Sequence, residues 1–211
     1  MPIAPPLLPS SDGSPSLAGP AARWGPLAPE HFEELALAKK RAATLTRALG
    51  IAKFNAWSFS IAGVLTLVMG LGDVETMVIG GLITVLGWNE FRGRTLLLAF
   101  DMKAPDVLGW NQVALMVLLV GYAAWKLLTL KAGANPYEEK IAAMPELGPM
   151  LEPFVKLYAD ISRWMYASMI LIGVVYQGGN ALYYFSRRKH LREFLEQTPE
   201  WVVKLQRTTR Q

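Results

Sequence analysis

The stretch GWNEFRGRTLLLAFDMKAPDVLGWNQ, residues 87–112, lies between two long apolar runs and contains the triplet Gly-Trp-Asn near each end. Most of its charged residues fall between the pairs Trp88-Asn89 and Trp110-Asn111. Trp favours the membrane–water interface, and Asn can cap a helix end there. We therefore expect a connector on a membrane surface, entered by one buried helix and left by another.

The composition supports a membrane protein. Of the 211 residues, 52% are hydrophobic and 18% are charged, against roughly 25% charged in soluble domains. The net charge is +4 and the sequence pI is 9.3, but no basic patch interleaves with aromatic residues as in a nucleic-acid site. We expect the lipid bilayer as a partner, and no nucleic acid. The chain has no cysteine, which excludes disulfides and thiolate chemistry.

The fold class expected is all-α: a polytopic membrane protein whose four transmembrane helices form two hairpins. The expected spans are residues 54–72, 74–91, 107–130 and 164–186. The first run carries no charge over 19 residues and the fourth none over 23, enough for a helix to cross the hydrocarbon core. The second has a charge-free core of only 14 residues, residues 76–89, so its assignment rests more on the charge pattern described below.

Five segments are expected outside this membrane domain or between its spans. Residues 1–29 hold eight of the fourteen prolines and predict an extended arm that is flexible or becomes ordered on a partner. Residues 30–53 predict a basic amphipathic helix on the membrane surface, with docking onto a partner helix as the alternative. Residues 92–106 form the connector, with Glu90 at its edge. Residues 131–163 form a loop with a short surface helix on the opposite side, and residues 187–211 a basic tail with short amphipathic helices.

The charge distribution predicts the orientation. Four spans place both ends and the connector on one side, which then holds 16 of the 21 Lys and Arg but 10 of the 17 Asp and Glu. Basic excess marks the cytoplasmic side. We expect a bacterial inner membrane with both termini cytoplasmic, or alternatively an organellar inner membrane. Trp57, Trp88 and Trp110 would mark the inner interface, completed by Tyr183 and Tyr184, while Trp125 and Trp164 would mark the outer one.

No motif predicts catalysis, a cofactor or a metal site. The two histidines, His31 and His190, lie outside the expected spans, and the sequence contains no HExxH, GxSxG or phosphate-binding loop. No pair of acidic residues lies within the charge-free core of a span, so a carboxylate proton relay is not expected. We expect a protein that is not an enzyme, with no catalytic residues, metal ligands or cofactor.

The residues of interest are instead small or polar residues in the spans. Gln177 and Asn180 are interpreted as interhelical hydrogen-bonding groups, or alternatively as contacts to a substrate, ion or cofactor. The packing and interface candidates are Gly80, Gly81, Thr84, Gly87, Trp88, Asn89, Trp110, Asn111, Gly178 and Gly179.

The function expected from these features is a non-catalytic membrane subunit or scaffold that packs against larger membrane protein partners. One alternative is a small homo-oligomeric transporter or channel, with Gln177, Asn180, Ser58 and Ser60 along its path. A second alternative is a membrane-shaping protein that uses the amphipathic helices near its two ends.

Overall fold

The structure is a computed structural model that describes residues 28–129 and 135–210. Every regular element within these ranges is helical. The expected arm, residues 1–29, lies outside the described residues except for its last two. The elements are α1 (Pro29–Met69), α2 (Val74–Leu98), α3 (Ala104–Thr129), α4 (Pro136–Ala143), η2 (Pro145–Leu147), α5 (Gly148–Ile172), η3 (Gly173–Gln177), α6 (Gly178–Gln197) and α7 (Glu200–Arg210).

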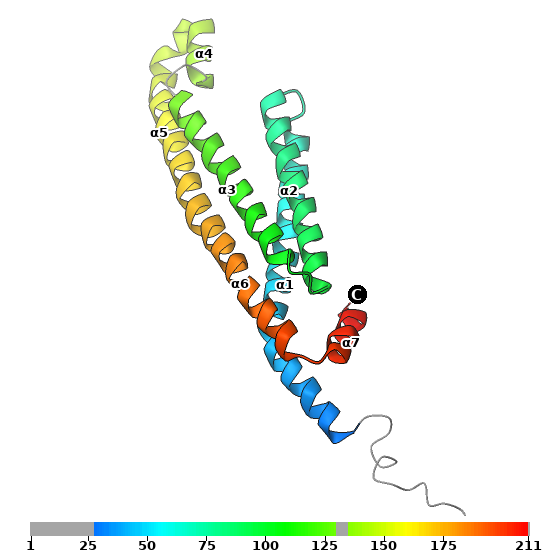
Figure 1. Ribbon diagram of the computed structural model, residues 1–211. Helices are drawn as coiled ribbons and strands as arrows, with labels where there is room; N and C mark the ends of the chain where they lie inside the picture. The colour runs from blue at the N-terminus through cyan, green and yellow to red at the C-terminus, as the bar shows by residue number, and fades with distance from the viewer. Residues whose placement is uncertain (1–27, 130–134, 211) are drawn as a thin grey trace, which may run out of the picture.

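The long helices form two hairpins that meet at one end and diverge at the other (Figure 1). One hairpin is α1 with α2; the other is α3 with the continuous rod of α5, η3 and α6. The start of α1, the α2–α3 turn and α7 all lie at the end where the hairpins meet. We call this the lower end, as drawn in Figure 1, and the end that carries α4 the upper end.

The α1–α2 hairpin turns tightly through residues 70–73. Gly72 has a φ of 100°, in the left-handed region that glycine adopts without strain. Asp73 then caps α2, because its carboxylate accepts hydrogen bonds from the backbone N–H groups of Glu75 and Thr76. These bonds, with one from the Thr76 hydroxyl, hold the pKa of Asp73 below its usual value.

Small residues let α1 and α2 pack with their backbones close together. A Cβ atom added at Gly80 would lie 2.6 Å from the Leu67 backbone nitrogen. At Gly87 it would lie 2.7 Å from the backbone nitrogen of Ser60. On α1, Gly63 lies in the same way against Thr84. Small residues permit this close approach between helix backbones.

The connector is shorter than residues 92–106. Helix α2 continues to Leu98 and α3 starts at Ala104, so only residues 99–103 form the turn. The turn needs a positive φ at Phe100, whose ring is buried and stacks on Phe194 of α6 with centroids 4.9 Å apart. The expected loop at residues 131–163 is likewise mostly helical where described, because α5 starts at Gly148 and runs directly into the apolar segment.

The apolar stripe of residues 30–53 is covered over most of its length by other parts of the same chain. It belongs to α1, which is one helix of 41 residues, and it is buried against α6, α7 and the α2–α3 turn. Trp201 of α7 donates a hydrogen bond from Nε1 to Glu34 at 3.0 Å, and Arg41 donates one to the Gln197 carbonyl. The tail of the same chain thus supplies apolar surface that covers much of this stripe, a packing that the sequence pattern did not predict. The buried apolar residues of this lower cap include Ala38, Ala42, Leu45, Leu97, Phe100, Leu191, Phe194 and Val202.

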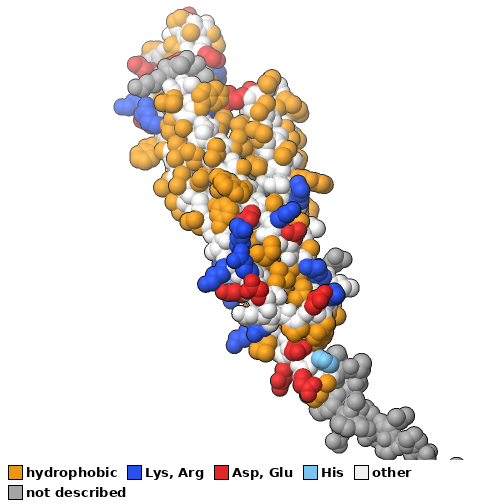
Figure 2. Space-filling view, viewed as in Figure 1, with side chains coloured by type: hydrophobic (Ala, Val, Ile, Leu, Met, Phe, Trp, Pro, Cys, Tyr) orange, Lys and Arg blue, Asp and Glu red, His pale blue; other side chains and the backbone are white. Residues whose placement is uncertain are grey.

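By length and apolar composition, two helices of the described residues, α1 and α3, could cross a membrane. Apolar side chains cover most of the upper part of the face shown in Figure 2, whereas charged side chains gather toward the lower end and near α4. The charge-free residues 164–186 are divided among α5, the π-helical turn η3 and α6. The backbone stays helical through both junctions, so this run lies on one continuous rod.

The α1–α2 seam makes a testable prediction about stability. Gly80→Ala should destabilise the protein by about 1–3 kcal/mol, because the new methyl group meets backbone atoms that cannot move aside. Gly81→Ala is the matched control, since its Cβ would enter open space; it should be neutral or stabilise by up to about 1 kcal/mol through helix propensity. Thermal unfolding in mild detergent measures both. Equal stability of the two variants would contradict the close helix contact.

Candidate functional site

A buried carboxylate, Glu90 of α2, lies where four helices meet. Its side chain has no solvent exposure. The sequence pattern had placed Glu90 at the edge of a surface connector, and that placement was wrong. Because α2 continues past residue 91, Glu90 falls inside the helix, on the face that also carries Gly87, Gly93 and Leu97.

Three side chains donate hydrogen bonds to the Glu90 carboxylate. Asn111 Nδ2 of α3 lies 2.6 Å from Oε2, and Gln112 Nε2 lies 3.0 Å from Oε1. The Tyr184 hydroxyl of α6 lies 3.1 Å from Oε1. An ionised carboxylate only accepts hydrogen bonds, so these three donors suit it. No ion pair reaches Glu90 in the described ranges.

The network extends to α1 and toward the surface between α2 and α3. Asn55 Nδ2 of α1 donates to the Tyr184 hydroxyl at 3.3 Å, so the bonds run from Asn55 through Tyr184 to Glu90. On the other side, Asn89 Nδ2 donates to Asn111 Oδ1 at 3.0 Å. Asn111 Nδ2 also donates to the Leu86 carbonyl at 3.0 Å. Side chains from α1, α2, α3 and α6 therefore form one connected network.

Helical spacing brings these side chains inward. On α1, Asn55 lies on the buried stripe of Ala48, Ala52 and Ala56. On α3, Asn111 and Gln112 are buried together with Leu108 and Leu115. The small side chains around Asn55 leave room for the amide, and polar groups in an apolar helix core bond across helices instead of to water. The arrangement can therefore fix the four helices in register.

The repeated Trp-Asn pairs are divided between the surface and this network. Trp88 and Trp110 are exposed, at 75% and 66%, whereas Asn89 and Asn111 bond to each other. The repeat thus brings its two asparagines together across the α2–α3 seam. Tyr184 was expected in an aromatic belt at the interface, but its side chain is fully buried and that expectation was wrong.

Among the described residues, neither Gln177 nor Asn180 forms a hydrogen bond to the Glu90 network. Gln177 ends η3, is 6% exposed and leaves Oε1 without a hydrogen-bond partner. Asn180, one turn later in α6, leaves Nδ2 enclosed and without a partner. Gly178 lies near Met116 of α3, while Gly179, like Gly81 on α2, faces open space. The structure does not bring these glycines together with Gly80, Thr84 and Gly87, which lie in the α1–α2 seam.

Within residues 28–129 and 135–210, no group of three or more His, Asp or Glu side chains is placed so that it could hold a metal ion. The chain matches no protein-family model, no curated protein and no solved structure in the three comparisons made.

Sequence reasoning missed the role of Glu90, although a signal was present. Gly80, Gly87, Glu90, Gly93 and Leu97 recur at steps of three, four and seven residues along one helix face. When a glycine-rich helix face packs against other helices, a charged residue on that face becomes buried. A count of charges along the sequence ignores the helix face and assigns the same residue to the surface.

Removing the carboxylate tests the network. Glu90→Leu should lower the free energy of unfolding by at least about 2 kcal/mol, because the amides of Asn111 and Gln112 and the Tyr184 hydroxyl lose their acceptor. Glu90→Gln keeps one acceptor oxygen and should cost less. Denaturation in detergent measures both, and Glu152→Leu, at an exposed position of α5, is the control for the loss of an acid. A Glu90→Leu protein as stable as the parent would contradict this role.

Proposed function

We propose that the protein is an integral membrane protein with four spans, and that it serves as a non-catalytic subunit or scaffold of a larger membrane complex. The apolar lengths of α1 and α3 support the first and third crossings. Helix α2 turns back along α1 over its whole length, and residues 164–186 of the α5–α6 rod carry no charge. These features support the second and fourth crossings.

The proposed orientation puts the lower end in the cytoplasm of a bacterial cell, or in the matrix or stroma of an organelle. The start of α1, the α2–α3 turn and α7 lie together at this end. A chain that crosses the membrane four times has its two ends and its middle turn on the same side, so this arrangement is consistent with four crossings. This end also carries the basic excess of the chain. Trp57, Trp88, Trp110, Trp125 and Trp164 are all exposed, between 48% and 75%, as residues of interfacial belts would be.

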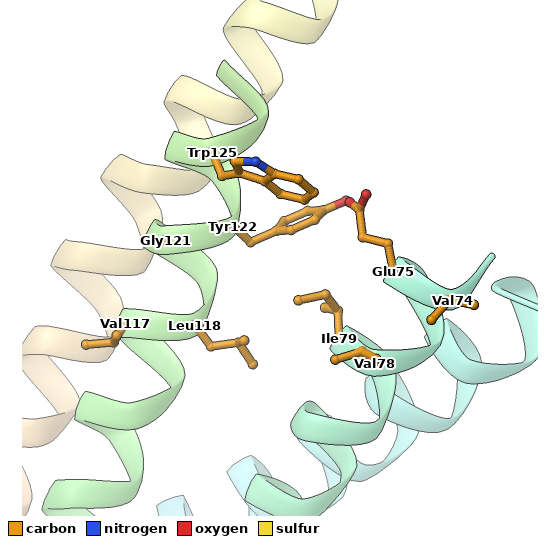
Figure 3. Close-up of a pocket in the computed structure, with 9 residues that line it drawn as sticks. All are labelled: Val74, Glu75, Val78, Ile79, Val117, Leu118, Gly121, Tyr122 and Trp125. Atoms are coloured by element: carbon orange, nitrogen blue, oxygen red, sulfur yellow. The ribbon is translucent and has the colours of Figure 1, made fainter. Parts of the chain in front are cut away.

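The observation that carries the proposed role is an open apolar groove between the two hairpins. It lies between α2 and α3 toward the upper end and has a volume of about 470 Å³. Figure 3 shows Val78 and Ile79 on one wall and Leu118, Tyr122 and Trp125 on the other. Glu75 lies near its upper end and pairs with Lys126 across the hairpins at 2.6 Å.

We propose that a transmembrane helix of a partner protein fills this groove. Protein interiors are close-packed, so an opening of this size between membrane helices needs an occupant. Gly121 lines the groove, and a Cβ atom there would meet nothing within 4 Å. Bare helix backbone facing an open groove allows another helix to approach closely. Lipid chains as the only occupant are the competing outcome of the test below.

The membrane-shaping alternative loses its main support. That role needs amphipathic helices with apolar faces free to enter the bilayer. The stripes of α1 and the tail are buried against each other in the lower cap.

Filling the groove tests the proposed role. Gly121→Leu should lower recovery of the partner at least about tenfold, as expected when a bulky side chain blocks close helix contact. The assay is gentle solubilisation of tagged protein, native sizing and mass spectrometry of the co-purifying chains. Gly179→Leu is the matched control, because Gly179 is an exposed helical glycine outside the groove with open space around it.

Two results would overturn the proposal. One is a parent protein that purifies from its membrane with lipid alone and no second polypeptide. The other is a partner retained equally by Gly121→Leu and Gly179→Leu.

A small transporter or channel is the second candidate, supported by a polar stripe on α6. Gln177, Asn180 and Tyr184 follow at steps of three and four residues, and the first two leave enclosed atoms unpaired. If a polar solute passes there, replacing both Gln177 and Asn180 with Leu should reduce its flux into liposomes at least about tenfold, because the path would lose its hydrogen-bonding groups. Unchanged flux would exclude this path.

A further inference from the structure

A second hollow lies between α2 and α3, below the apolar groove and on the surface side of the Glu90 network. It has a volume of about 490 Å³. The polar and aromatic residues that line it are Asn89, Arg92, Lys103, Asp106, Trp110 and Asn111.

The charges around this hollow favour an anion. Arg92 and Lys103 are exposed, and neither forms an ion pair in the part of the chain that the structure describes. The acidic residue that lines the hollow is Asp106, and Arg188 of α6 forms an ion pair with it at 3.5 Å. Because Asp106 pairs with Arg188, the two cationic groups on α2 and on the α2–α3 turn remain available to a ligand.

The remaining lining suits a molecule with a polar head and an apolar chain. Asn89 Nδ2 carries two N–H groups, of which one bonds to Asn111, so one donor remains for a ligand oxygen. Leu86, Val107 and Ala114 form an apolar wall. The apolar groove described above lies between the same two helices, farther toward the upper end. The exposed Trp110 sits where an interfacial aromatic belongs.

The floor of the hollow is held in place by the buried network. Asn111 lines the hollow and also donates to Glu90, which in turn accepts bonds from Gln112 and Tyr184. A preorganised polar floor lowers the ordering cost of binding.

We propose that this hollow binds the phosphate head group of an anionic phospholipid from the surrounding membrane, with an acyl chain along the apolar wall between α2 and α3. Basic pockets between transmembrane helices on the cytoplasmic side recognise such head groups. The inference rests on the proposed membrane insertion of this chain. It adds a specific lipid partner that is independent of any protein in the upper groove.

The test compares lipid binding to full-length protein in a mild uncharged detergent, by native mass spectrometry and by thermal shift. The probes are phosphatidylglycerol, cardiolipin and zwitterionic phosphatidylcholine. The double variant Arg92→Gln with Lys103→Gln should bind both anionic lipids roughly 10- to 30-fold more weakly than the parent, since each basic group near such a lipid contributes attraction. Lys39→Gln with Lys53→Gln is the control: it removes the same charge from exposed positions on α1 and should change binding less than about twofold.

Equal affinity of the parent for anionic and zwitterionic lipids would overturn the inference, and so would equal weakening in the two double variants. Inorganic phosphate should not displace the lipid at equal concentration, and displacement would assign the hollow to a free anion instead. These outcomes apply to protein extracted from membranes. Recovery of the parent in the soluble fraction without detergent would instead refute membrane insertion itself, so the two failures are distinguishable.

Discussion

The burial of Glu90 is the constraint on which much of the remaining structure depends. A carboxylate in an apolar interior is costly unless several donors reach it. Those donors come from α3 and α6, and Asn55 of α1 supports one of them. All four long helices must therefore meet at the level of Glu90. The tight α2–α3 turn, with Phe100 at a positive φ, keeps α3 close enough for Asn111 and Gln112 to reach the acid.

Different interactions hold the two ends of the molecule. At the lower end, the polar network adjoins a cap of buried apolar side chains from α1, α6 and α7. Along the first hairpin, close backbone contact at Gly63, Gly80 and Gly87 holds α1 to α2. Toward the upper end, the hairpins diverge and the Glu75–Lys126 pair spans the opening. The lower end is thus fixed in register, while the upper groove between α2 and α3 is open.

Local sequence patterns predicted the helical class, and charge-free runs located most of the long helices. They did not predict which residues meet across helices. Asn89 and Asn111 were interpreted as two separate interfacial residues, yet they bond to each other because the short turn places α2 beside α3. Glu90 and Tyr184 were assigned to the interface because both lie near the ends of apolar runs. Position along the chain does not show whether a side chain there points to the surface or to the interior. The stripe of residues 30–53 is amphipathic as predicted, but its covering surface comes from residues some 150 positions away, as in the Arg41–Gln197 contact.

The central claim is that four crossings enclose the Glu90 network and leave the α2–α3 turn on the same side as the tail. Single-cysteine labelling tests it most directly, because the chain has no cysteine of its own. Lys103→Cys, Lys189→Cys and Glu152→Cys each place one thiol at an exposed position. In sealed vesicles of defined orientation, a membrane-impermeant maleimide should label the first two from one side and the third only from the other. Labelling of Lys103→Cys and Glu152→Cys from the same side would show that α3 does not cross, and would contradict the account.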